Sequence, residues 1–122
     1  MAGMRTTVLV VEDEMPIRLD IVCALEDAGF DVLEAANVAE AVAVLTDHAE
    51  IRAVFTDVDM PGSMDGLTLA ATVYAQWPQT KIIVTSGHRS VKQSDLPVAS
   101  RFVSKPYNPS TIVANLSEML AA

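Results

Sequence analysis

The sequence predicts an α/β fold in which a five-stranded parallel sheet is doubly wound, with helices on both faces. Short apolar runs rich in β-branched residues alternate five times with segments of helical periodicity. The apolar runs are almost continuous, which is typical of strands that are buried on both faces. No internal repeat or low-complexity linker interrupts the pattern, so residues 1–122 are expected to form one domain.

The expected strands are short, and polar or turn-forming residues follow them. In chain order they are Thr7–Val11, Asp31–Ala35, Ala53–Thr56, Lys81–Thr85 and Ser100–Val103. Apolar runs of this length, bounded in this way, fit strands better than helices.

The expected helices have recognisable ends. They cover Pro16–Ala28, Asn37 to about His48, Gly66–Trp77 and Ser110–Leu120. Pro16 suits a first helical turn, and Gly29 ends the first helix. Asn37 and Glu40 have the spacing of a capping-box variant at the start of the second helix. A fifth helix, between His88 and Leu96, is expected to be short and mobile because that segment is polar and poorly periodic.

Composition narrows the class of partner. The formal net charge of −8 disfavours direct binding to nucleic acid or to an anionic membrane, so protein partners are favoured. No apolar run approaches the length of a membrane span, and Met1–Thr6 lacks the apolar stretch of a signal peptide. The protein is therefore expected to be soluble and cytoplasmic. Cys23 is the single cysteine and is interpreted as a small helix residue.

The stretch VFTDVDMPGSMDG, residues 54–66, concentrates acidic residues at the end of a buried strand. Asp57 stands where the apolar run must surface, because Pro61 and Gly62 are turn residues. Asp65 precedes a helical pattern and is expected to cap that helix. An aspartate at the exit of a strand is well placed to meet a ligand, so Asp57 is the candidate reactive residue.

Polar side chains also follow three of the other expected strands. Glu12 and Asp13 follow the first strand, Thr85 closes the fourth, and Lys105 follows the fifth. In a doubly wound sheet, ligands bind beyond the carboxyl ends of the strands, where strand order reverses. We therefore expect Asp57 to meet these side chains at one edge of the sheet.

The carboxylates of Glu12, Asp13 and Asp57, if they lie close together, favour the binding of a cation. They repel one another and raise each other's pKa unless a positive ion offsets their charge. Oxygen ligands without nearby Cys or His favour a hard ion, and Mg²⁺ in particular also accepts phosphate oxygens. With Lys105 and Thr85 available to hold phosphoryl oxygens, Asp57 is the expected nucleophile and would form an aspartyl phosphate.

These residues resemble the receiver domain of two-component response regulators across essentially the whole chain. The matching motifs, in order, are VVEDE, FTDVDMPG, MDG, VTSG and FVSKPY. Their order on the expected elements makes the resemblance specific. It implies a stand-alone receiver similar to chemotaxis response regulators, with the flavodoxin-like strand order 2-1-3-4-5.

The resemblance also implies a metal site. Asp57 would be the phosphoacceptor and a Mg²⁺ ligand, Asp13 a direct ligand, and Glu12 a ligand through water. The main-chain carbonyl of Asp59 would complete the protein ligands.

A second set of implied roles concerns the phosphoryl group and its readout. Thr85 and Lys105 would contact the phosphoryl group, and the Lys105–Pro106 peptide would be cis. Phe102 holds the place of an aromatic residue that in the family changes rotamer as the Ser/Thr residue moves.

Signalling partners follow from the same resemblance. A histidine kinase or histidine phosphotransfer protein would donate the phosphoryl group. The signal would pass to an unknown downstream protein through the face formed by residues 88–96, 100–103 and 110–120. Homodimerisation on phosphorylation stays open. Met1 and the finished last helix favour a complete chain, which leaves no room for a DNA-binding output domain.

Three departures from the family pattern stand out. Gly62–Ser63 makes the loop after Pro61 one residue longer than is usual. Phe102 replaces the commoner tyrosine, which removes a hydroxyl. Asp59 adds a fourth acid, and with Gly87 it occupies positions that in this family tune dephosphorylation.

Three other functions fit parts of the sequence. Asp57-Val58-Asp59 matches the nucleophile and acid pair of haloacid-dehalogenase-type phosphatases, but that signature belongs after a first strand. A phosphorylation-independent interaction module would not need the acids, hydroxyl and lysine together. A flavodoxin-like cofactor carrier would have a phosphate-binding loop after the first strand, where this chain has acids.

Overall fold

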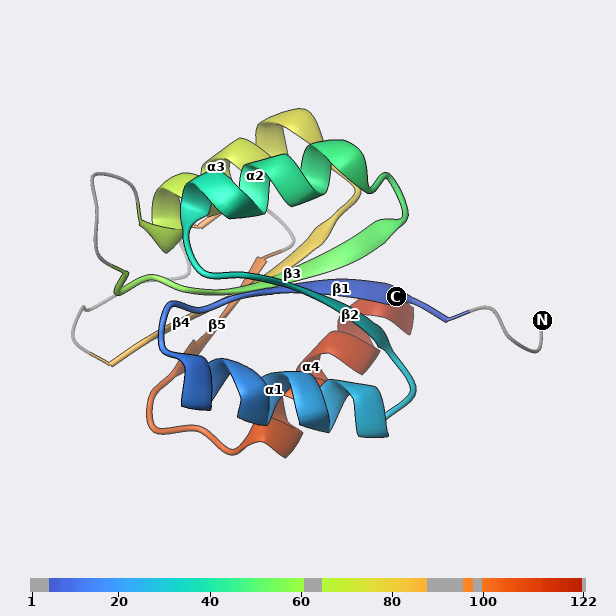
Figure 1. The fold of residues 1–122 in the computed structure, drawn as a ribbon, viewed down its shortest axis with the longest axis vertical. Coiled ribbons are helices and arrows are strands. Elements are labelled where there is room, and N and C mark those ends of the chain that lie inside the picture. The colour runs from blue at the N-terminus through green and yellow to red at the C-terminus, as the bar shows by residue number, and fades with distance from the viewer. Residues whose placement is uncertain (1–4, 61–64, 88–95, 98–99, 122) are drawn as a thin grey trace.

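The computed structural model of the protein describes residues 5–60, 65–87, 96–97 and 100–121. Its centre is a parallel five-stranded sheet in the order β2-β1-β3-β4-β5. The strands are β1 (Thr7–Val11), β2 (Asp31–Ala35), β3 (Ile51–Asp57), β4 (Lys81–Ser86) and β5 (Ser100–Ser104). The helices are α1 (Met15–Asp27), α2 (Val38–Asp47), α3 (Gly66–Gln76) and α4 (Pro109–Ala121). Helices α1 and α4 cover one face of the sheet and α2 and α3 the other (Figure 1), which confirms the predicted fold and strand order.

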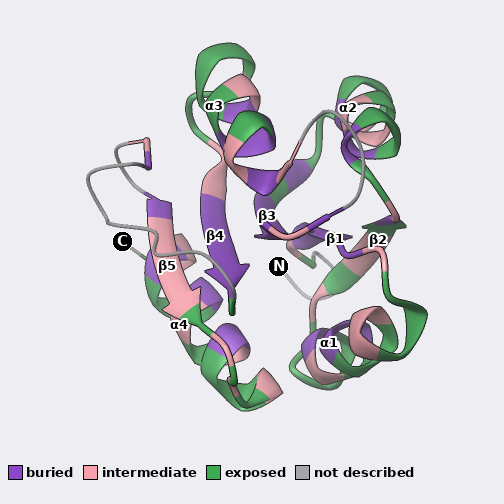
Figure 2. Cartoon of the chain, turned by 90° about the vertical axis from the view of Figure 1, so that its left-hand side faces the viewer, coloured by how far each residue is buried: buried purple, intermediate pink, exposed green. Residues whose placement is uncertain are grey.

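The central strands are buried on both faces, as their continuous apolar runs predict. Every residue of β1 is buried, and so is β4 from Ile82 onward, whereas β2 and β5 at the edges are partly exposed (Figure 2). Because side chains alternate along a strand, Leu9 and Val11 pack in the core beneath α2 and α3. Val8 and Val10 pack in the other core, beneath α1 and α4.

Helix ends follow the capping signals in the sequence. The Asn37 side chain accepts a hydrogen bond from the Glu40 backbone N–H at 2.8 Å, and Asp65 caps α3 in the same way. Gly29 adopts φ +98° just after α1, and its N–H donates to the Glu26 carbonyl. No helix in the described ranges has the length and apolar character that crossing a membrane requires.

Strand β3 is longer than the sequence predicts. It begins at Ile51, not Ala53, because the exposed Arg52 between these buried residues hides the start of the apolar run. It also includes Asp57, which is therefore held by the sheet itself. The helix predicted between His88 and Leu96 lies outside the described residues, apart from the buried Leu96.

Candidate functional site

The sheet brings the predicted site residues together at the edge formed by the carboxyl ends of its strands. Asp57 ends β3 and lies in register with Thr85 of β4. Val11, the last residue of β1, pairs with Thr56, so Glu12 and Asp13 emerge beside Asp57. Since all five strands are parallel, Lys105 leaves β5 at the same edge.

Three carboxylates form a cluster at this edge. Oxygen atoms of Glu12, Asp13 and Asp57 all lie within 4.8 Å of one another. Asp57 is 2% exposed and Glu12 is fully buried. Burial raises the pKa of Glu12 to about 8; the hydrogen bond from the Glu14 backbone N–H lowers it in part, and the negative charge of Asp57 raises it again. Without a cation, Glu12 is therefore protonated at neutral pH, next to the buried Asp57.

Lys105 supplies a positive charge on one side of the cluster. Its Nζ donates to Asp57 Oδ2 at 2.7 Å. Partial burial lowers the pKa of Lys105, but the hydrogen bond and the charge of Asp57 outweigh that effect, so the pKa is raised. Lys105 therefore stays charged beside Asp57 at neutral pH. The Lys105–Pro106 peptide bond is cis.

The Asp59 side chain contacts the end of β4. Its backbone N–H donates to Asp57 Oδ1 at 2.9 Å. Its carboxylate Oδ2 accepts from the Ser86 hydroxyl at 2.9 Å and from the Gly87 N–H at 3.2 Å. The fourth acid is thus adjacent to the cluster, but its side chain is bonded to the end of β4.

Thr85 and Phe102 occupy neighbouring strands behind the cluster. The Thr85 hydroxyl is buried and lacks a hydrogen-bond partner among the described residues, as does Glu12 Oε1. Phe102 pairs in register with Val84, is partly buried, and packs against the core beneath α2 and α3. Two buried oxygen atoms at the site can therefore still take a partner.

Arg18 holds the acidic loop in place, a role that the sequence pattern does not reveal. Its Nη1 donates to the Glu12 carbonyl at 2.8 Å, and its Nε to Glu34 Oε1 at 2.9 Å. Only the helical position of Arg18, one turn after the acidic loop, could have indicated this contact.

Gly66, the first residue of α3, was also missed as a packing residue. A Cβ on Gly66 would lie 2.8 Å from the Asp57 carbonyl carbon and from Val58 Cα. Glycine therefore allows α3 to start directly against the end of β3. The sequence signal was the MDG motif.

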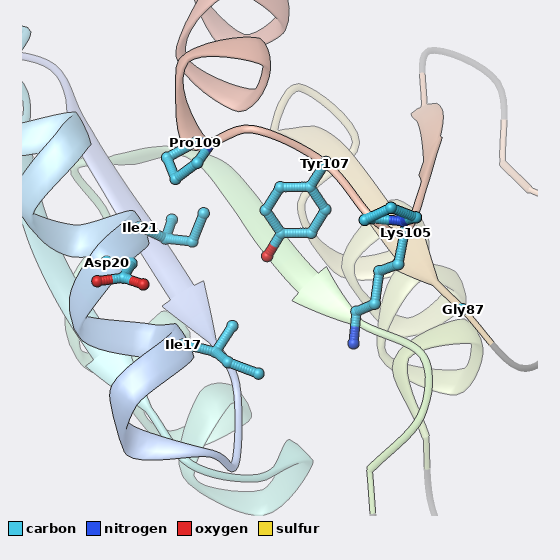
Figure 3. A pocket seen from close by; sticks show the side chains of 8 residues that line it. Ile17, Asp20, Ile21, Gly87, Lys105, Tyr107 and Pro109 are labelled. Carbon is cyan, nitrogen blue, oxygen red and sulfur yellow. The ribbon is translucent and has the colours of Figure 1, made fainter.

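A cavity of about 500 Å³ opens beside Lys105, between α1 and the loop that follows β5. Its lining residues are Ile17, Asp20, Ile21, Gly87, Lys105, Pro106, Tyr107 and Pro109. The Tyr107 ring meets Phe55 edge-on, with ring centroids 6.1 Å apart, and its hydroxyl points toward α1 (Figure 3). Burial, followed by the charges of Glu12 and Asp57, raises the Tyr107 pKa, so this hydroxyl stays protonated.

Comparison with known families agrees with this geometry. Residues 8–117 match the response regulator receiver domain. The chain belongs to this family. Its members are signalling domains of two-component systems.

Similar proteins differ widely in length. The receiver is 33% identical over 118 residues to the response regulator receiver protein CpdR of Brucella abortus, covering 94% of this chain and 97% of CpdR. It is 36% identical over 118 residues to the sensor kinase CckA of the same organism, covering 93% of this chain but 12% of CckA. It spans about a quarter of several NtrX-like response regulators.

Solved structures give the same result. A response regulator receiver protein from Sinorhizobium medicae superposes with a TM-score of 0.89 at 28% identity, covering 97% of this chain and 96% of the other.

Proposed function

We propose that residues 1–122 act as one receiver domain whose Asp57 accepts a phosphoryl group from a phosphohistidine, with Mg²⁺ required. The observation that carries this proposal is the buried Asp57 carboxylate, bonded to Lys105 at 2.7 Å and clustered with two other acids. A histidine kinase makes phosphohistidine from ATP, whether or not a phosphotransfer protein then carries the phosphoryl group, so we place the receiver in the cytoplasm.

The acidic cluster fits a magnesium ion. Its ligand atoms are all oxygens, and the buried Glu12 Oε1 has no partner within the part of the chain that the structure describes. Asp13, Asp57 and the Asp59 carbonyl would hold the ion, and Glu12 would hold it through water. When bound, Mg²⁺ would offset negative charge on the carboxylates and on the transferred group.

The reaction would use Asp57 as the nucleophile. A carboxylate oxygen forms a bond to phosphorus as the phosphorus–nitrogen bond of phosphohistidine breaks, and the imidazole nitrogen keeps that electron pair. The Lys105 ammonium and the Thr85 hydroxyl would then donate hydrogen bonds to phosphoryl oxygens. Asp59 is a poor candidate for the acid of a phosphatase, because its carboxylate is bonded to Ser86 and Gly87.

Acetyl phosphate tests the acceptor without a partner protein. Intact-mass spectrometry should show one added phosphoryl group on the wild type in the presence of Mg²⁺. Asp57→Asn should show none, whereas Asp59→Asn, a matched change two residues along, should still be phosphorylated. Equal phosphorylation of wild type and Asp57→Asn would refute the assignment.

The cavity beside Lys105 is the proposed docking place of the phosphodonor. It opens at the phosphorylation site and its walls are mainly apolar, which suits a helix of the donor that carries its histidine toward Asp57. Ile17, on α1, is a central wall residue (Figure 3).

Comparing phosphoryl transfer from a protein donor with the acetyl phosphate reaction separates an effect on docking from an effect on the chemical step. Ile17→Gln should slow transfer from a phosphorylated histidine phosphotransfer domain but leave the acetyl phosphate reaction unchanged. Tyr74→Gln is the control, because Tyr74 is exposed on α3, across the sheet. Equal transfer to Ile17→Gln and Tyr74→Gln would exclude this docking place.

The output would leave through β5 and α4. Thr85 is buried at the site and pairs with Val103 of β5, the neighbour of Phe102, so a movement of the Thr85 backbone can reach β5. Beryllofluoride, which mimics the phosphoryl group, should shift the amide resonances of β5 and α4 while leaving those near Trp77, at the end of α3, in place. Shifts confined to the loops around Asp57 would contradict this route to a downstream protein.

A further inference from the structure

The Asp59 side chain connects the loop after β3 to the end of β4. Its Oδ2 accepts hydrogen bonds from the Ser86 hydroxyl at 2.9 Å and from the Gly87 N–H at 3.2 Å. We call these three residues, Asp59, Ser86 and Gly87, the clasp. A carboxylate with two donors makes a stronger contact than a bond between neutral groups.

The clasp is bonded to the reactive residue and to the lysine. The Asp59 backbone N–H donates to Asp57 Oδ1 at 2.9 Å, and the Ser86 carbonyl accepts from the Lys105 N–H at 3.1 Å. A Cβ on Gly87 would lie 3.2 Å from Lys105 Cβ, so this segment has little room on the lysine side. The end of β4 is thus held between Asp59 and Lys105.

Thr85 precedes the clasp directly. Its hydroxyl is buried and, within the described ranges, without a hydrogen-bond partner, while Ser86 next to it is bonded to Asp59. Thr85 pairs in register with Asp57, so a phosphoryl group on Asp57 can attract this hydroxyl, and any movement of the Thr85 backbone carries Ser86 with it.

We propose that the Asp59–Ser86 hydrogen bond is a positioning contact. It holds the end of β4 in the position that it has while Asp57 is unphosphorylated, and it breaks when Asp57 is phosphorylated. The inference rests on the proposed phosphorylation of Asp57. A phosphoryl group on Asp57 adds negative charge beside the Asp59 carboxylate. It also needs hydrogen-bond donors from the end of β4, where the Ser86 hydroxyl and the Gly87 N–H already donate to Asp59. The contact therefore opposes phosphorylation.

Loss of the Ser86 hydrogen bond and general damage to the site would change the affinity for a phosphoryl mimic in opposite directions. Ser86→Ala removes one bond to the carboxylate but leaves the charge of Asp59 and the Gly87 N–H in place. If that bond exists only in the unphosphorylated state, its loss favours the phosphorylated arrangement by about tenfold. General damage to the site would have the opposite effect, because a disordered site binds its ligand more weakly.

The test is the affinity for beryllofluoride at saturating Mg²⁺, measured by the bound ¹⁹F signal. Ser86→Ala should bind about tenfold more tightly than the wild type. Ser104→Ala is the matched control: Ser104 is the residue of β5 in register with Ser86, is exposed, and should leave the affinity unchanged.

A double-mutant cycle tests whether Asp59 is the hydrogen-bond partner through which Ser86 acts. Adding Ser86→Ala to Asp59→Ala should gain little further affinity, because the hydrogen bond is already lost. Equal or weaker binding by Ser86→Ala than by the wild type would overturn the clasp, as would full additivity with Asp59→Ala. Failure of the wild type itself to bind beryllofluoride through Asp57 would instead refute the proposed function.

Discussion

Replacing Glu12 by glutamine should remove a pH dependence of stability that this carboxyl group creates. Glu12 is fully buried, and burial, together with the charge of Asp57, raises its pKa to about 8 despite the hydrogen bond from Glu14. The ordinary pKa of a glutamate side chain, which applies in the unfolded chain, is 4.5. Glutamine has the shape of the protonated acid but does not titrate, so the substitution isolates the proton.

The sign follows from proton binding in the two states. Between pH 4.5 and about 8, native Glu12 holds a proton that the unfolded chain has released. The native state then binds more protons, so the free energy of unfolding falls as pH rises through this window. One proton gives at most about 1.4 kcal/mol per pH unit, which amounts to about 2 kcal/mol between pH 6 and pH 7.5.

Urea unfolding without divalent ions measures this difference. From pH 6 to pH 7.5, the wild type should lose about 2 kcal/mol relative to Glu12→Gln. Both histidines are present in both proteins, so their titration cancels in the comparison. Adding Mg²⁺ should recover stability in the wild type, more at pH 7.5 than at pH 6, because the charged carboxylate is the form that suits a cation. Identical pH slopes for the two proteins would refute the assignment of the buried proton to Glu12.

Three further substitutions test the supports of the site. Gly66→Ala should destabilise the protein by about 1–3 kcal/mol, since the added Cβ would crowd the end of β3; an unchanged urea midpoint would argue against that close packing. Arg18→Met should cost about 1–3 kcal/mol and weaken Mg²⁺ binding, because it frees the Glu12 carbonyl; calorimetric titration with Mg²⁺ should detect the change, and wild-type affinity would contradict this role. Asn37→Ala should cost about 1 kcal/mol through loss of the α2 cap while leaving Mg²⁺ affinity unchanged, and retained stability would contradict the capping contact.

Much of the fold could be predicted because local and long-range signals agree. The continuous apolar run of β1 indicates a strand buried on both faces, and the Asn37 and Asp65 signals mark helix starts that the structure has. The predicted start of β3 at Ala53 was wrong. The burial of Ile51 depends on its neighbours across the sheet, and Arg52 interrupts the apolar run along the chain.

The position of the acidic cluster was predictable, but its internal bonding was not. Strand ends of a parallel sheet meet at one edge, which is enough to bring Asp57 and Lys105 together. The direction of the Asp59 side chain depends on rotamers and on donors far along the chain, such as Ser86. The Arg18 contact with the Glu12 carbonyl depends in the same way on how α1 is placed. Sequence spacing does not contain that information.

Chemical location of the phosphoryl group tests directly whether Asp57 is the phosphoacceptor. After treatment with acetyl phosphate and Mg²⁺, borohydride reduces an aspartyl phosphate to homoserine, and peptide mass spectrometry identifies the altered residue. Homoserine is expected at position 57 alone, and none when Mg²⁺ is chelated beforehand. Homoserine at Asp13 or Asp59, or equal yield without Mg²⁺, would contradict the assignment of Asp57 as the metal-dependent phosphoacceptor.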